Sequence, residues 1–80
     1  MDFIDKGMRM KLNIEIIKRV AARHGYQMDD EACSELLAGS HEGETIGRAL
    51  VDYLLAYEGL TAFRCNAIVN DKEARVKLCA

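Results

Sequence analysis

Five side chains in this 80-residue chain could bind a metal ion or act as a nucleophile or base: His24, Cys33, His41, Cys65 and Cys79. No two of them form a CxxC or HxxxH pair, the spacings typical of structural zinc sites. A cysteine nucleophile would also need an orienting third group and a pocket, and a chain of this length leaves little volume for one. The sequence therefore predicts no metal, no cofactor and no catalytic residue.

The acidic residues Asp29, Asp30 and Glu31 are adjacent along the chain. Adjacent carboxylates at the start of an apolar-periodic stretch cap a helix, whereas a catalytic pair must face each other across a gap. We therefore expect a binding domain and not an enzyme. No small-molecule substrate is evident.

Composition predicts one soluble domain covering residues 1–80. Half of the residues are apolar, which is too many for a disordered chain. No run approaches the roughly 18 apolar residues of a membrane span, and the charged start lacks the apolar centre of a signal peptide. The three cysteines are expected as free, largely buried thiols. These features predict a cytoplasmic protein that does not associate with membranes.

Charge is distributed unevenly along the chain. No Lys or Arg lies between Arg23 and Arg48, whereas six acidic residues do, and basic residues gather towards both ends. Such asymmetry is typical of solvated faces of opposite sign, and it also permits a nucleic-acid site.

The most regular pattern runs from Glu44 to Glu58, where apolar residues recur at helical spacing. We predict that this stretch is the core helix, with Thr45 as its N-cap. One helix is expected before it from Asn13 to His24, with Asn13 as cap. A second, shorter helix is expected after the cap residue Asp29.

Alternation of apolar and polar residues predicts strands at both ends of the chain. Residues 8–14 fit a short N-terminal strand, and residues 62–69 and 74–79 fit a β-hairpin around the turn 70–73. The expected fold is therefore α+β, a three-helix core followed by a C-terminal hairpin. The alternative is an all-α fold with a terminal helix capped by Asn70 or Asp71.

The order of these elements, and residue types between 31 and 60, resemble a winged helix-turn-helix domain. The matching stretch is EACSELLAGSHEGETIGRALVDYLLAYEGL, and the residues that fit the T-[VI]-x-R-x-L recognition helix and its close are Thr45, Ile46, Arg48, Leu50, Gly59 and Leu60. This resemblance implies a regulator that binds nucleic acid. A fainter similarity, carried by HGYQMDDEA and the glycine-rich turn, is to the small helical lid of AAA-type ATPases. It implies no activity, because the chain has no phosphate-binding loop.

The side of the core helix opposite its buried stripe predicts a protein partner. Val51 and Leu55 are apolar there, within a rim of Arg48, Asp52 and Glu44. An apolar centre with charged surroundings is the anatomy of a modest interface. The alternative is that both apolar residues pack against the hairpin or the N-terminal strand. The leading hypothesis is a small regulator, adaptor or inhibitor that acts by protein contact or self-association.

DNA binding is the alternative function. The residues that would contact nucleic acid lie at the start of the core helix and in the wing: Thr45, Arg48, Lys72, Arg75 and Lys77. Only Arg48 is a good donor on the recognition helix, whereas Glu44 and Asp52 would repel phosphates. The charges therefore favour a protein partner over DNA.

Overall fold

A computed structural model describes the backbone of residues 2–78 and the side chains of residues 11–78. The described elements are the α-helices α1 (Asp2–Arg23), α2 (Asp30–Ala38), α3 (Ile46–Tyr57) and α4 (Ala62–Val69) and the 3-10 helix η1 (Glu73–Arg75). Within residues 2–78, β pairing is limited to one antiparallel bridge between Thr45 and Lys77. The fold is therefore helical, and the expected α+β class is wrong.

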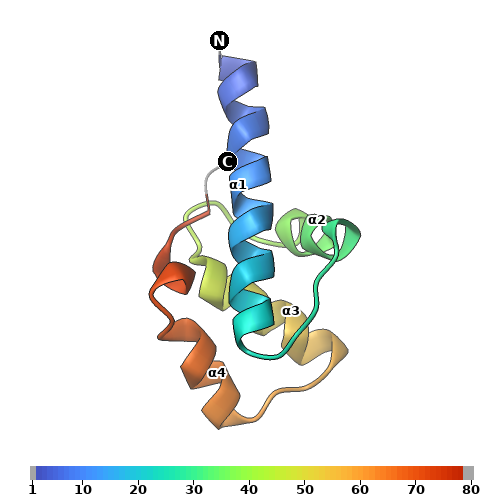
Figure 1. The fold of residues 1–80 in the computed structure, drawn as a ribbon, viewed down its shortest axis with the longest axis vertical. Helices are drawn as coiled ribbons and strands as arrows, with labels where there is room; N and C mark the ends of the chain where they lie inside the picture. Colours follow the sequence, from blue (N-terminus) through green and yellow to red (C-terminus); the bar gives the residue numbers. More distant parts are fainter. Residues whose placement is uncertain (1, 79–80) are drawn as a thin grey trace.

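Helix α3 is the centre of the packing. It contacts α1, α2, α4 and η1, while the N-terminal turns of the long helix α1 project beyond the other elements (Figure 1). The largest fully buried side chains come from all four α-helices: Ile17, Val20, Cys33, Ile46, Leu50, Leu54 and Ile68. The prediction that residues 44–58 form the core helix is confirmed, although Tyr57 at its end is 65% exposed.

Polar caps begin three of the helices. The Asp29 carboxylate accepts a hydrogen bond from the Ala32 N–H at 2.8 Å, and the Thr45 hydroxyl accepts one from the Arg48 N–H at 3.2 Å. Thr61 caps α4 in the same way. The caps predicted at Asp29 and Thr45 are confirmed, because such caps depend only on neighbouring residues.

The N-terminal strand expected at residues 8–14 is wrong, because this stretch belongs to α1. The helix is unbroken from Asp2, so Asn13, the expected cap, lies inside it and is buried. A strand here would need a neighbouring strand for its N–H and C=O groups, and residues 2–78 contain none to pair with it. A helix satisfies these groups within itself.

The first strand of the expected hairpin is also wrong, because residues 62–69 form α4. Cys65, Ile68 and Val69 pack towards the core at helical spacing, and Ile68 is fully buried. Phe63, which alternation placed with Cys65 and Val69, is 82% exposed. The two patterns are easily confused because a spacing of four residues fits both. Asn70 ends this helix and does not begin one.

The second strand of the hairpin is replaced by η1 and a short extended segment. The Ile46 N–H donates to the Val76 carbonyl at 2.8 Å, and the Leu78 N–H donates to the Glu44 carbonyl at 2.7 Å. The chain after η1 therefore pairs with the loop that precedes α3. The end of the predicted strand, residue 79, lies outside the described residues.

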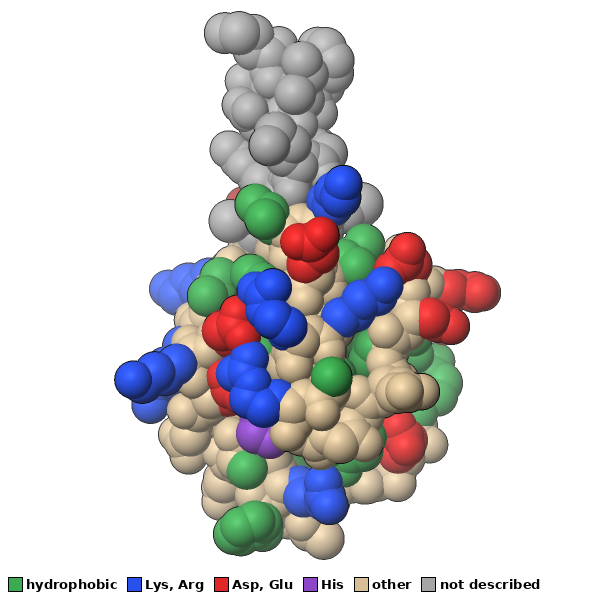
Figure 2. Space-filling model, in the orientation of Figure 1, with side chains coloured by type: hydrophobic (Ala, Val, Ile, Leu, Met, Phe, Trp, Pro, Cys, Tyr) green, Lys and Arg blue, Asp and Glu red, His purple; other side chains and the backbone are tan. Residues whose placement is uncertain are grey.

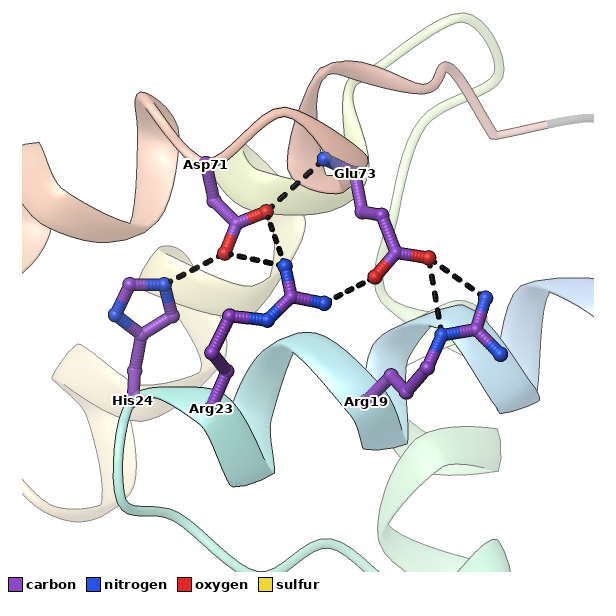
Figure 3. Close-up of polar contacts among 5 residues, drawn as sticks. All are labelled: Arg19, Arg23, His24, Asp71 and Glu73. Carbon is purple, nitrogen blue, oxygen red and sulfur yellow. Dashed lines mark hydrogen bonds and ion pairs between the residues drawn. The ribbon is translucent and has the colours of Figure 1, made fainter.

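Ion pairs and hydrogen bonds hold the segment around η1 against the C-terminal end of α1 (Figure 3). Arg23 Nη1 lies 2.9 Å from Asp71 Oδ1, and Arg23 Nη2 contacts Glu73 Oε1. Arg19 Nη2 lies 2.7 Å from Glu73 Oε2, and His24 Nε2 lies 2.9 Å from Asp71 Oδ2. The Asp71 carboxylate also accepts the Glu73 N–H and is only 5% exposed. These five residues form the α1–η1 cluster.

Both carboxylates of this cluster have lowered pKa values. Burial alone would raise the pKa of Asp71, but hydrogen bonds from His24 and the Glu73 N–H, with the charge of Arg23, lower it from 3.8. Hydrogen bonds from Arg19 and Arg23 lower the pKa of Glu73 from 4.5. The unfolded chain therefore binds protons more tightly at these sites. Their stabilisation is present above these ordinary values and is lost as pH falls through the lowered folded-state values.

We expect the urea midpoint of unfolding to fall when the pH is lowered from about 7 to about 3, because protonation removes these ion pairs. The double variant Asp71→Asn with Glu73→Gln should be less stable at neutral pH and should lose less on acidification. Circular dichroism measures both midpoints, with Glu31→Gln, an exposed acid of α2, as the control. Equal losses in the double variant and the parent chain would contradict this assignment.

Candidate partner-binding surface

The exposed side of α3 carries three of the residues predicted to bind a partner. Arg48 and Asp52 are one turn apart, with side chains 67% and 52% exposed, and Arg48 Nε lies 3.6 Å from Asp52 Oδ1. Leu55 follows three residues later and is 47% exposed. Spacings of four and seven residues place all three on one face of a helix. Arg48, Asp52 and Leu55 are called the α3 surface below.

Val51 belongs to the core and not to this surface, which corrects the prediction. It is 4% exposed and lies four residues after Gly47 and three before Leu54, both of which are buried. Helix η1 covers this side of α3 so closely that a β-carbon added at Gly47 would lie 2.8 Å from the Ala74 Cβ. The alternative of core packing therefore holds for Val51, with η1 and α4 in the place of the expected hairpin.

Glu44, the remaining predicted residue, lies at the rim of a groove between α2 and α3. The residues that line this α2–α3 groove are Glu35, Leu36, Gly39, Ser40, His41, Glu44, Ala49, Asp52 and Tyr53. Glu44 is half-buried, and its Oε1 accepts the His41 N–H at 3.2 Å. Because Asp52 belongs to both features, the groove and the α3 surface form one continuous area.

An aromatic pair stands at one side of this groove. The ring centroids of Tyr53 and Tyr57 are 4.5 Å apart. Burial raises the pKa of the Tyr53 hydroxyl, and the Glu35 carboxylate raises it further. Glu35 and Tyr53 therefore line the same groove, and the Glu35 charge acts on the Tyr53 hydroxyl.

The residues predicted to contact nucleic acid lie around η1 and the start of α3. The antiparallel bridge brings Lys77 beside Thr45, which caps the helix that carries Arg48 in its first turn. Lys72 and Arg75 are exposed at the two ends of η1. Figure 2 shows Lys and Arg side chains along the edge formed by η1 and the following segment, and Asp and Glu side chains over α2 at the opposite edge.

The sequence interpretation missed the α1–η1 cluster and the aromatic side of the groove. Arg19 and Arg23 are one helical turn apart, which indicates a shared face but not which acids they meet. Asp71 was interpreted as part of a hairpin turn, or as the cap of a terminal helix. Among side chains 11–78, no three His, Cys, Asp or Glu residues lie close enough together to hold a metal ion.

Comparisons of this chain with protein-family models, with curated proteins and with solved structures gave no match. The resemblance to a winged helix-turn-helix domain therefore stays a prediction. In the part of the chain that the structure describes, no helix combines the length and the apolar character needed to cross a membrane.

Proposed function

We propose that this domain is a non-catalytic protein-binding module, a small regulator, adaptor or inhibitor, that meets its partner through the α3 surface. The observation that carries the proposal is Leu55, which is 47% exposed next to the charged pair of Arg48 and Asp52. A partner that covers this side chain would remove its apolar surface from water, which favours association. The flanking charges would supply the polar rim of an interface.

Leu55 alone is too small to support a complex. Full burial of a leucine contributes about 1.5–3 kcal/mol, whereas micromolar binding requires about 8 kcal/mol. The α2–α3 groove supplies further contact area, because Asp52 lies on the border of both features. The proposed interface therefore consists of the α3 surface together with the groove.

We expect Leu55→Asp to weaken partner binding or self-association by about tenfold or more, because it places a charge at the apolar centre. Leu12→Asp is the matched control, since Leu12 is 55% exposed but lies on α1. Light scattering over a concentration series measures self-association, affinity capture measures the partner, and circular dichroism measures helix content. A complex that survives Leu55→Asp, or a loss of helix content, would contradict the proposal.

A DNA-binding regulator is the second candidate. It is favoured by the bridge that brings Lys77 to the N-cap of α3, near Arg48, with Lys72 and Arg75 on η1. The pairing of Arg48 with Asp52 opposes it, because this contact places a carboxylate where a phosphate would approach.

Duplex DNA binding at about 50 mM and about 200 mM salt tests the second candidate. A protein that makes six or more phosphate contacts should bind about a thousandfold or more weakly at the higher salt, because each counterion that it releases gains less entropy in the more concentrated solution. Fluorescence anisotropy of a labelled duplex measures the change, and Arg75→Glu should weaken binding at both salts. The absence of binding at the lower salt would reject this candidate.

A further inference from the structure

The α2–α3 groove is a negatively charged surface with an apolar floor. Leu36 and Ala49 are buried side chains at its base, and the carboxylates of Glu35, Glu44 and Asp52 line it. Its lining includes no Lys or Arg. The nearest basic neighbour along α3, Arg48, is held by Asp52 through an exposed ion pair at 3.6 Å, and such pairs contribute little. Apart from Arg48 at its Asp52 end, the groove therefore has no lysine or arginine among the described side chains to balance its acidic residues.

The end of α2 adds to this negative potential. The C-cap residue Gly39 and Ser40 both line the groove, and the last turn of α2 contains no basic side chain. The C-terminal end of a helix carries a partial negative charge that favours a cation nearby. This feature is independent of the three carboxylates, and it acts at the same place.

The aromatic side of the groove suits a long, cationic side chain. A Lys or Arg side chain buries its aliphatic part against apolar surface and keeps its charged end near water or acids. Tyr53 lines the groove and its ring lies beside that of Tyr57, and the face of a tyrosine ring attracts a cation. A metal ion fits less well, because within residues 11–78 no three candidate ligands lie close enough to coordinate one.

We propose that the α2–α3 groove binds a Lys or Arg side chain from a basic segment of a partner protein. This inference rests on the proposed function, because the groove continues into the α3 surface at Asp52. The partner is a separate protein and not a second copy. Lys72 and Arg75 are exposed around η1, which covers a different side of α3 from the groove. Copies joined through these residues would therefore use two different surfaces and could not form a two-fold dimer.

Nuclear magnetic resonance titration of the whole chain tests the groove without knowledge of the partner. The probes are N-acetyl-lysine-N-methylamide and N-acetyl-arginine-N-methylamide, and the control is N-acetyl-norleucine-N-methylamide, which has an uncharged aliphatic side chain. We expect saturable shifts of the backbone amides of Gly39, Ser40 and Ala49, with a Kd of about 1–20 mM. The norleucine compound should bind about tenfold or more weakly. Equal shifts with all three compounds, or no shifts at these amides, would overturn the proposal.

Charge-neutralising variants assign the effect to the groove. We expect Glu35→Gln and Glu44→Gln each to weaken binding of the lysine probe about three- to tenfold, because each variant removes one of the three carboxylates. Glutamine at position 44 keeps an oxygen that can accept the His41 N–H. Glu42→Gln, an exposed acid that does not line the groove, is the matched control and should change nothing. Equal effects of Glu42→Gln and Glu44→Gln would overturn the assignment.

Two further outcomes separate this inference from the proposed function. Leu55→Asp should still bind the lysine probe but should no longer bind the partner, because Leu55 does not line the groove. If Leu55→Asp still bound both the probe and the partner, the proposed role of the α3 surface would be contradicted and that of the groove would not. If it lost the partner while the parent chain failed to bind the probe, only the groove would fail.

Light scattering tests whether the groove binds a second copy. If the mass of the parent chain rose with concentration and the mass of Glu44→Gln did not, the groove would bind another copy of this chain, and the proposal of a separate partner would be overturned.

Discussion

Ile68→Ala is expected to lower the free energy of unfolding by about 2–5 kcal/mol, because the Ile68 side chain is fully buried where α4 packs into the core. The loss combines the transfer free energy of the removed methyl and methylene groups with the cavity that remains. Urea unfolding followed by circular dichroism measures this difference.

Phe63→Ala is the matched control on the same helix. The Phe63 side chain is 82% exposed, so its removal should change stability by about 0.5 kcal/mol or less. A hairpin would reverse the order, because alternation places Phe63 with Cys65 and Val69 and places Ile68 on the opposite side. A larger loss in Phe63→Ala than in Ile68→Ala would therefore contradict α4.

Gly47→Ala is expected to destabilise the domain by about 1–2 kcal/mol. The added β-carbon would lie 2.8 Å from the Ala74 Cβ, 3.2 Å from the Ala74 carbonyl oxygen and 3.2 Å from the Val69 Cα. Alanine improves helix propensity by about 1 kcal/mol. Overpacking costs about 1–3 kcal/mol, and three contacts of 2.8–3.2 Å place this site in the upper part of that range. The cost dominates here because backbone atoms cannot rotate away as a flexible side chain would.

Gly39→Ala separates crowding from the general effect of replacing a glycine. Gly39 has φ −93°, and an added β-carbon would meet its nearest neighbour, the Glu35 carbonyl oxygen, at 3.8 Å. We expect this variant to be neutral or more stable by up to about 1 kcal/mol, because alanine restricts the unfolded chain. The urea midpoints of both variants give the comparison. Stability equal to or above the parent chain in Gly47→Ala would mean that η1 does not pack against α3 as described.

The packing around Gly47 also decides which residues of α3 remain available to a partner. Helix η1 covers the side that carries Gly47 and Val51, whereas Arg48, Asp52 and Leu55 stay exposed. Substitutions on the covered side would report on folding. Only substitutions on the exposed side can report on binding while the fold is kept.

Signals between neighbouring residues were sufficient for much of the helical core. The caps at Asp29 and Thr45, and the apolar spacing within α3, could be predicted because each depends on residues within one or two turns. The uneven charge was also evident in the sequence, and the structure places many of the acids on α2 and the loops around it. Arg48, Asp52 and Leu55 were correctly predicted to share one side of the helix, because helix geometry alone determines which residues lie on the same side.

Contacts between distant segments decided the rest. Whether Val51 faces solvent depends on the approach of η1, and whether Asp71 belongs to a turn or to a cluster depends on α1. In residues 62–69 the local pattern fits a strand and a helix, because a four-residue spacing satisfies both periods. The helix forms because it brings Ile68 into the core, and because residues 2–78 contain no strand with which residues 62–69 could pair. Burial and pairing partners are properties of the assembled chain, so the short-range pattern could not reveal them.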